Sequence, residues 1–531
     1  MSAPDWRDVI AQGRTALGIE LGSTRIKACL VAADDPATVI ALGTHLWENR
    51  YEDGCWTYSL DEVWSGIRAA IADLGADAEA RHGTRPGRFG SIGVSAMMHG
   101  YLAFDAAGEL LVPFRTWRNT STVAAADELV EAFGVNIPLR WSVAHVLQAI
   151  RDGEPHVRHI AHLTTLAGYV HWQLTGERVL GIGDASGMFP VDGAARAFDA
   201  GLLERFDALV ADADLGWRLA DVLPAIRTAG DPAGTLTPAG ALLLDASGGV
   251  APGAVLCPPE GDAGTGMVAT NAIAPRTGNV STGTSIFAMI VLERPLSELH
   301  REIGIVATPA GDPAAIVHAN NGASELGEWA ALFVRFAHAA GFEIDHDRAF
   351  ATLLAEAKAA PPDAGGVLAY NLLAGEAILA LPEGRPLVTR STAAELSLGS
   401  LMRAQVYAAF ATLALGMRVL ASEGVRLDLM QAHGGMFRTE GVAQRLLAAA
   451  LDTTVAVSAT ASEGGAWGMA LLAAYVERAD EESLAEYLER RVFRDALETR
   501  VAPDPADVAG FGAYLDRYVA GLPIQVAAAA I

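Results

Sequence analysis

The stretch "GIELGSTRIKACLV", residues 18–31, decides how the first half of the chain folds. Two apolar segments are joined by the short turn Gly22-Ser23-Thr24, which is the pattern of a β-hairpin. A turn rich in glycine and hydroxyl residues lets backbone N–H groups converge, and such a nest binds phosphate without needing net positive charge. The stretch therefore predicts a hairpin that is able to hold an anion.

This hairpin has both a functional and an ordinary interpretation. In the functional one, Gly22 allows a ligand to approach closely, and Ser23 and Thr24 add hydroxyl donors. Lys27 supplies a cation on the returning strand, and Glu20, at the end of the first strand, is a candidate to hold hydrated Mg²⁺. In the ordinary interpretation the hydroxyl residues only form the turn, and Glu20 points to solvent.

A second stretch, "VSTGTSIFAMIV" at 280–291, repeats the pattern with Gly283, Thr284 and Ser285 in the turn. The two turns are about 260 residues apart. Such a repeat predicts a duplicated architecture of two α/β lobes with a cleft between them, and a boundary near Ala272. We expect the segment from 479 to 531 to be a helical extension.

The bulk composition favours a large globular protein and argues against a nucleic-acid partner. Of 531 residues, 51% are hydrophobic and 19% are charged, which is enough apolar material for two lobes. The chain carries 38 Lys and Arg against 63 Asp and Glu, and a net charge of −25 would repel a phosphate backbone. Any anionic ligand must therefore be held by local groups.

The cysteines and the N-terminal segment predict a cytoplasmic protein without a membrane partner. Cys29, Cys55 and Cys257 are odd in number and widely spaced, so they suggest neither a disulfide framework nor a zinc site. The first 15 residues include acidic side chains and no apolar core of signal-peptide length. No run of 18 or more apolar residues follows.

Asp262 is the candidate general base. It lies in "GDAGTG", residues 261–266, where a strand gives way to a glycine-rich turn and a helix. The ordinary alternative is an aspartate that only caps this helix. The familiar phosphate fingerprints G-x-x-x-x-G-K-[ST] and G-x-G-x-x-G are absent from the chain.

Two other segments carry candidate sugar-binding residues. His99 follows a predicted strand in "AMMHGYLAFD", residues 96–105, although a histidine beside two methionines is also commonly a packed residue. The loop "TWRNTST", residues 116–122, offers an aromatic wall in Trp117 and polar side chains in Arg118 and Asn119. Its ordinary alternative is a partly exposed loop tryptophan.

Taken together, these motifs resemble the FGGY family of carbohydrate kinases, within the sugar kinase, Hsp70 and actin superfamily. The resemblance runs over about residues 15–478. It implies two ribonuclease H-like (actin-like ATPase) lobes with mixed five-stranded sheets, over 15–272 and 273–478. "HGGMFRTEG" (433–441) and "SEGGAWGMALLAA" (462–474) are similar to the family's adenosine-binding loop and closing helix.

The resemblance also assigns roles to residues. It implies that both hairpins bind ATP phosphates, that Gly434 and Gly435 contact the adenosine, and that ATP and Mg²⁺ are the cofactors. Asp262 maps onto the catalytic aspartate, which also contacts the sugar, and Glu20 onto the residue that holds the metal through water. Met98, His99 and Gly100 are similar to the Met-His-Gly segment that lines the sugar pocket of xylulokinases.

This chain departs from the family pattern at three positions. Glu20 stands where the family usually has aspartate, which is one methylene shorter. In the sugar loop, Asn119 stands at the usual acidic position and Thr122 where arginine is expected. The change at Glu20 bears on the geometry of the metal site, and the two changes in the sugar loop bear on the identity of the sugar.

The implied function is ATP-dependent phosphorylation of a terminal hydroxyl of a ketose-like sugar, with D-xylulose as the first candidate. Other ketoses or polyols, such as ribulose or erythritol, remain alternatives. So do a sugar-independent ATPase of the same fold and a sugar sensor without activity. The expected partners are the sugar and ATP, and a homodimer is possible.

Overall fold

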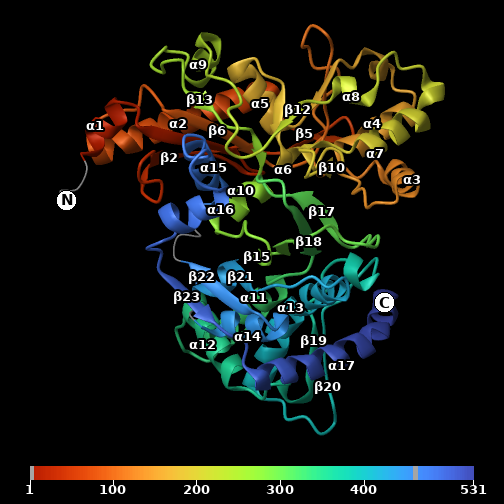
Figure 1. The fold of residues 1–531 in the computed structure, drawn as a ribbon. Helices are drawn as coiled ribbons and strands as arrows, with labels where there is room; N and C mark the ends of the chain where they lie inside the picture. The colour runs from red at the N-terminus through yellow and green to blue at the C-terminus, as the bar shows by residue number, and fades with distance from the viewer. Residues whose placement is uncertain (1–4, 440, 459–463) are drawn as a thin grey trace. The chain divides into compact units, whose positions relative to one another are not determined.

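The computed structural model describes residues 5–439, 441–458 and 464–531 (Figure 1). It divides into two compact units. Unit 1 comprises Met1–Ile273, Ile305–Ala314 and Glu463–Asp495, and unit 2 comprises Ala274–Gly304, Ala315–Ser462 and Ala496–Ile531. The predicted lobe boundary near Ala272 lies beside the first of these divisions.

The sheet of unit 1 is mixed, as the resemblance implies, and it has six strands rather than the five expected. Its order is β13-β6-β1-β2-β3, and β14 also pairs with β6. The hairpin pairs β1 with β2 antiparallel, whereas β6 runs parallel to β1. β13 and β14 pair with successive parts of β6 and share one position. The bounds are β1 (Thr15–Leu21), β2 (Arg25–Ala32), β3 (Val39–Leu46), β6 (Ser91–Ala96), β13 (Val255–Leu256) and β14 (Glu260–Gly261).

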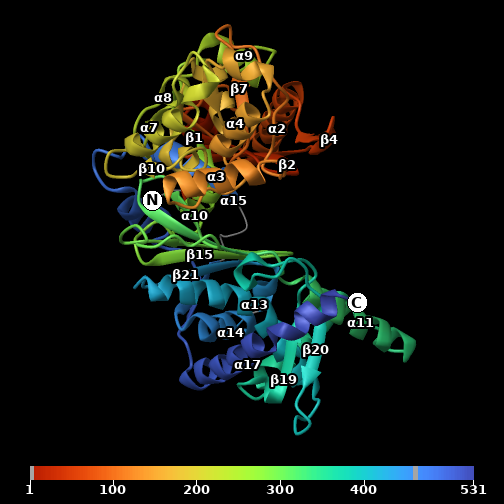
Figure 2. The same ribbon diagram turned by 90° about the vertical axis from the view of Figure 1, so that its right-hand side faces the viewer.

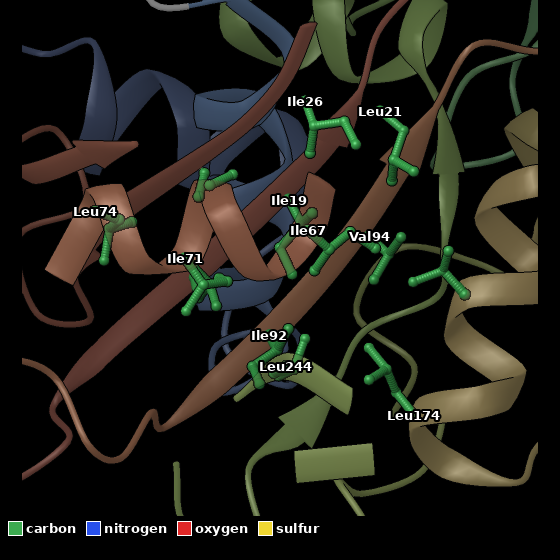
Figure 3. Close-up of a cluster of buried hydrophobic side chains, with 14 of the residues drawn as sticks. Ile19, Leu21, Ile26, Ile67, Ile71, Leu74, Ile92, Val94, Leu174 and Leu244 are labelled. Atoms are coloured by element: carbon green, nitrogen blue, oxygen red, sulfur yellow. The ribbon is translucent and has the colours of Figure 1, made fainter. Parts of the chain in front are cut away.

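Side-chain alternation along β1 divides the two faces of this sheet. Leu17, Ile19 and Leu21 belong to one buried cluster with the apolar residues of helix α2 (Leu60–His82). Figure 3 shows Ile19 and Leu21 with Ile67, Ile71 and Leu74 in this cluster. Gly18 and Glu20 therefore lie on the opposite face.

Helix α15 (Gly464–Tyr475) covers that opposite face. It approaches β1 so closely that a Cβ atom on Gly18 would lie 2.1 Å from the backbone oxygen of Ala466. No side chain fits at that distance, so glycine is required at position 18. The glutamate two residues along β1 consequently lies beneath α15, with only 7% of its surface exposed.

The remaining elements of unit 1 are short strands and helices. The strands are β4 (Arg50–Glu52), β5 (Cys55–Thr57), β7 (Leu102–Phe104), β8 (His162–Thr164), β9 (Val179–Gly181), β10 (Val191–Asp192), β11 (Ala197–Phe198) and β12 (Ala225–Arg227). The helices are α1 (Trp6–Ala11), α3 (Val123–Phe133), α4 (Ser142–Arg151), α5 (Leu166–Thr175), α6 (Ile182–Ala185), α7 (Ala200–Leu209), α8 (Leu219–Val222), α9 (Pro238–Leu244), α10 (Asp262–Ala269) and α16 (Leu484–Tyr487).

The second sheet is also mixed, and it has seven strands rather than the five expected. Its order is β17-β18-β16-β15-β21-β22-β23. β15 pairs antiparallel with β16 in the second predicted hairpin and parallel with β21 on its other side. The bounds are β15 (Thr277–Thr282), β16 (Ile286–Val291), β17 (Gly304–Ala307), β18 (Pro313–Ala319), β21 (Leu429–Gly434), β22 (Thr454–Ser458) and β23 (Glu498–Val501).

Helices and a small two-stranded sheet complete the described part of unit 2 (Figure 2). Helix α13 is long and apolar enough to cross a membrane, but 72% of its most apolar window is buried, as in the core helix of a globular domain. The bounds are α11 (Ser324–Ala339), α12 (His346–Ala359), α13 (Leu398–Ser422), α14 (Val442–Leu451), α17 (Pro505–Ala529), β19 (Val367–Tyr370) and β20 (Leu387–Arg390).

Two assignments from the sequence differ from this arrangement. Helix α15 was expected in the second lobe, but it packs on β1 and β6 and belongs to unit 1. The segment after 478 was expected to be helical, yet it contributes the edge strand β23, which pairs with β22. A short polar strand at a sheet edge carries too little apolar periodicity to stand out in the sequence.

Helix α17 is fixed to unit 2 by a buried ion pair. Arg403 on α13 pairs with Asp507 on α17, and their side chains are only 2% and 1% exposed. Arg445 on α14 contacts the second oxygen of the same carboxylate. Three helices therefore meet at Asp507.

We expect Asp507→Ala to lower the free energy of unfolding by about 3–5 kcal/mol, because Arg403 would stay buried without its carboxylate. Urea denaturation of the full chain measures this change. Asp516→Ala is the matched control, since Asp516 and Arg418 are 3.8 Å apart with both side chains largely exposed. It should change stability by under about 1 kcal/mol. Equal effects of the two substitutions would contradict the anchoring role of Asp507.

Candidate active site

The opening hairpin holds Glu20 and Lys27 face to face. The two residues are direct cross-strand partners in the β1–β2 register, and Lys27 Nζ lies 3.0 Å from Glu20 Oε2. Glu20 Oε1 lies 2.3 Å from where a Cβ atom on Gly465 would stand, so α15 covers the carboxylate closely. The solvent-facing alternative for Glu20 is therefore excluded.

The carbonyl groups of this turn accept hydrogen bonds from side chains elsewhere in unit 1. Trp47 Nε1 donates to the carbonyl of Gly22 at 2.7 Å, and the Tyr58 hydroxyl donates to the carbonyl of Ser23 at 2.7 Å. Within the described part of the chain, the backbone N–H groups of Ser23 and Thr24 donate no hydrogen bond. The turn thus keeps two exposed donors available for an anion.

The turn between β15 and β16 in unit 2 repeats this arrangement with different partners. The N–H groups of Gly322 and Ala323 donate to the carbonyls of Thr284 and Gly283, at 2.7 and 2.8 Å. The N–H groups of Thr284 and Ser285 have no acceptor among the residues that the structure describes. Both predicted phosphate turns therefore have occupied carbonyls and free N–H groups.

Gly434 lies directly beside this second turn. It is the register partner of Thr282 at the ends of β21 and β15. Its φ is 117°, and a Cβ atom there would lie 2.1 Å from the carbonyl oxygen of Thr282, so only glycine fits. Gly434 and Gly435 are both exposed. In the second glycine-rich segment, Ser462 and Glu463 lie outside the described residues.

Asp262 lies at the carboxyl end of β14, next to the carboxyl end of β6. It is the first residue of α10, whose N-cap is Gly261, so it is not the capping aspartate of the ordinary interpretation. Its Oδ1 accepts a hydrogen bond from the backbone N–H of Met98 at 3.3 Å. The parallel strands thus bring the candidate base to the Met98–Gly100 segment.

The surroundings of Asp262 make it a better base than a free aspartate. Its side chain is open to solvent, yet desolvation by the protein around it and the charge of Glu20 raise its pKa to about 6, against the lowering effect of the Met98 N–H. A base with a pKa near the working pH combines the correct charge state with good proton affinity. This value suits proton transfer near neutral pH.

Two further acids lie nearby, and the sequence analysis missed both. Glu260 accepts from the N–H groups of Gly183 and Asp184, and burial and the charge of Asp184 raise its pKa to about 8. Burial, with a contribution from Asp262, raises the pKa of Asp184 to about 7, although Thr165 donates to its Oδ2. Their partial protonation limits the negative charge around Asp262. In the sequence, the signal that could have identified Asp184 is an aspartate surrounded by small residues in "GIGDASG", residues 181–187.

His99 has a constrained backbone and one defined tautomer. Its φ of 72° is left-handed, which is uncommon for a residue with a side chain, and Gly100 follows with a φ of 98°. Nδ1 lies 3.2 Å from the carbonyl of Gly187, which can only accept, so Nδ1 carries the proton and Nε2 is an acceptor. Burial and the charge of Arg140 lower the pKa of His99 to about 3, which keeps the ring neutral.

Asn119 and Thr122 of the predicted sugar loop form hydrogen bonds with backbone groups of the protein. Asn119 is 6% exposed; it accepts from the N–H of Trp56 and donates to the carbonyls of Trp56 and Thr116. Thr122 donates to the carbonyl of Leu139. Trp117 is partly buried against the core of unit 1. The structure thus gives Asn119 a structural role and leaves its side chain little capacity for a ligand.

Unit 1 therefore brings together Glu20, the first turn, Lys27, the Met98–Gly100 segment and Asp262. Unit 2 brings together the second turn and the Gly434-Gly435 pair. The aromatic residues Trp47 and Tyr58, which orient the first turn, were not predicted. Their rings stack with centroids 4.1 Å apart, but no local sequence signal connects them to a turn 25 or more residues away.

Comparisons with known proteins agree with this arrangement. Residues 15–251 match the N-terminal domain of the FGGY family of carbohydrate kinases, and residues 278–477 match its C-terminal domain. No curated protein sequence matches the chain.

Solved structures with the same fold extend over nearly the whole chain. A xylulose kinase from Rhodospirillum rubrum is 21% identical, covers 96% of this chain and 99% of its own, and has a TM-score of 0.76. A gluconate kinase from Lactobacillus acidophilus is 16% identical, covers 96% of this chain and 98% of its own, and has a TM-score of 0.76. A glycerol kinase from Plasmodium falciparum is 14% identical, covers 95% of this chain and 97% of its own, and has a TM-score of 0.72. With both family domains matched in order over most of its length, the chain belongs to the FGGY family of carbohydrate kinases.

Proposed function

We propose that this carbohydrate kinase transfers the γ-phosphoryl group of ATP to a terminal hydroxyl of a small ketose-like sugar, with Asp262 as the general base. The observation that carries the proposal is the placement of Asp262, which is open to solvent, bonded to the N–H of Met98 and has a pKa of about 6. Such a carboxylate can accept the hydroxyl proton as the acceptor oxygen attacks phosphorus.

The two turns supply the electrostatic part of the mechanism. Free N–H groups at Ser23 and Thr24, and at Thr284 and Ser285, are oriented donors for phosphate oxygens. Phosphoryl transfer depends mainly on positioning and on stabilising charge at these oxygens. Lys27, which is partly exposed, adds one cation beside the first turn. Because Gly434 and Gly435 have no side chains, the nucleotide could lie directly against their backbone.

The donor set of unit 1 fits hydrated Mg²⁺. Glu20 and Asp262 place two carboxylates near each other, as the effect of Glu20 on the pKa of Asp262 indicates. Mg²⁺ prefers one or two carboxylates together with water and phosphate oxygens. Glu20 would hold the ion through water, and the bound ion would neutralise charge on the β- and γ-phosphates. Lys27 holds Glu20 in place from the opposite strand.

The acceptor would lie along the Met98–Gly100 segment. The neutral His99 ring leaves Nε2 as an acceptor for a sugar hydroxyl, and Trp117 would supply an apolar wall. D-xylulose is the first neutral acceptor to test, since proteins of the same fold include xylulose kinases. Ribulose, erythritol and other polyols follow, since glycerol kinase shares the fold as well.

An ADP-release assay over a panel of ketoses and polyols distinguishes this function from its competitors. A kinase forms ADP only when a suitable acceptor is present. An ATPase of the same fold would form ADP at the same rate with or without sugar, and a sugar sensor would bind sugar and form none.

We expect Asp262→Asn to lower kcat by about 10²- to 10⁴-fold, as for a lost general base, with acceptor binding nearly unchanged. Steady-state kinetics and acceptor titration measure the two effects. Asp212→Asn, at an exposed site in unit 1, is the control for the loss of one negative charge. An unchanged kcat in Asp262→Asn would remove Asp262 from the mechanism.

The pKa of Asp262 also predicts a pH profile. Because the base works only when ionised, kcat/KM should be level above about pH 7 and fall about tenfold per pH unit below its pKa of about 6. Initial rates from pH 5 to 8 test this, with circular dichroism at each pH to show that the fold is intact. A profile without an acid limb between pH 5 and 7 would be the contrary result.

Replacing Glu20 tests the metal site. Glu20→Gln keeps the shape but removes the charge, so the Mg²⁺ concentration for half-maximal rate should rise by about 10- to 100-fold. Mg²⁺ titration at fixed ATP and acceptor measures it. Wild-type Mg²⁺ dependence in this variant would mean that Glu20 serves only to pair with Lys27.

A further inference from the structure

Arg140 is tied to the segment that carries His99. It lies just before helix α4, and its carbonyl accepts from the N–H of Gly100 at 3.2 Å. Ser142, two residues later, donates to the carbonyl of Gly100 at 2.6 Å. These two bonds hold the Arg140 backbone against one end of the Met98–Gly100 segment. The other end is held by Asp262, through the N–H of Met98.

Among the residues that the structure describes, the guanidinium of Arg140 has no anionic partner. It is partly buried, and it makes no ion pair or hydrogen bond with any residue in the described ranges 5–439, 441–458 and 464–531. Its charge nevertheless acts on His99. The neighbouring cation Arg115 is different, because it pairs with Glu154. His145, another titratable group near His99, is buried and kept neutral, with a pKa lowered to about 3.

The guanidinium of Arg140 is taken partly out of water, and this desolvation lowers its pKa. Acidic residues outnumber basic ones by 63 to 38, so partners are abundant. Taking a charge out of water without a partner is unfavourable, and buried charges are normally paired. A planar guanidinium is suited to bind a carboxylate through two parallel hydrogen bonds. The missing partner is therefore expected to come from a ligand.

The sugar loop carries less negative charge than the family pattern implies, and its residue Thr122 donates to the carbonyl of Leu139, next to Arg140. Position 119, where the resemblance implies an acidic residue, is the neutral Asn119, and its amide holds the backbone of Trp56. Arg118 lies over the ring of Trp56 at 3.7 Å and has no acidic partner among the residues described. Both features favour an anionic over a neutral acceptor.

We propose that Arg140 binds a carboxylate of the acceptor, so that the preferred substrates are polyhydroxy acids rather than neutral sugars. The inference rests on the proposed kinase function and refines its acceptor class. The terminal hydroxyl lies at Asp262 and the carboxylate at Arg140. The backbone N–H groups of Met98 and Gly100, two residues apart on one segment, bond to the Asp262 carboxylate and to the Arg140 carbonyl, respectively.

The wild-type protein tests this with pairs of acceptors that differ only at C1, where a carboxylate in one replaces a CH₂OH group in the other. D-gluconate is compared with D-glucitol, and D-xylonate with xylitol, with D-xylulose as the neutral ketose. We expect kcat/KM for the better acid to exceed that for its alditol by about 10- to 100-fold, the range of a hydrogen-bonded charged group. The preference should shrink as salt concentration rises.

Substitution of Arg140 tests whether this residue causes the preference for acids over alditols. Arg140→Met should abolish the preference for the acid and leave KM for ATP unchanged, whereas Arg140→Lys should retain part of it. Arg158→Met, at an exposed arginine of the turn Pro155–His159, removes the same charge and should keep the wild-type preference. Thermal melting shows whether each variant is folded. If Arg140→Met does not fold, stabilisation of the wild-type protein by D-gluconate but not D-glucitol is the expected result.

The contrary outcomes separate the two proposals. If D-xylulose or an alditol is phosphorylated and the acids are not, the role of Arg140 is wrong and the kinase function stands. The same holds if Arg140→Met keeps the wild-type preference for acids. If no acceptor stimulates ADP formation and Asp262→Asn has wild-type activity, the proposed function itself fails.

Discussion

The close contact between strand β1 and helix α15 is the constraint on which the first unit depends. It requires glycine at position 18 and, through the alternation of side chains, places Glu20 on the covered face beneath Gly465. A carboxylate in that position needs a cation, and Lys27 supplies one from the opposite strand. The contact also explains why residues from near the C-terminus belong to unit 1.

In both hairpins the carbonyl groups of the turn accept hydrogen bonds, but the donors differ between the two. In the first, side chains of Trp47 and Tyr58 occupy the carbonyls of the turn; in the second, backbone N–H groups of Gly322 and Ala323 do so. Both leave two N–H groups free. A chain with a net charge of −25 can thereby offer phosphate sites without a basic patch, because oriented dipoles act locally.

The sequence predicts the hairpins, the duplicated α/β architecture and the position of Asp262 well, because glycine and hydroxyl residues between apolar strands are local signals. It does not reveal what depends on distant contacts. The side chain of Asn119 is engaged by Trp56, 63 residues earlier in the chain, and that contact has no local pattern. The orientation of Glu20 follows from the helix that packs on β1. That Arg140 has no acidic partner among the described residues is visible only when its surroundings are known.

In the proposed reaction, phosphoryl groups pass from ATP to a terminal hydroxyl and not to water. Phosphorus NMR of the full reaction, with ATP, Mg²⁺ and a mixture of neutral and acidic acceptors, tests it most directly. We expect a new phosphate monoester signal that grows as ATP is consumed and couples to the protons of a terminal CH₂ group. A reaction that yields only ADP and inorganic phosphate, at a rate independent of the acceptors, would contradict it.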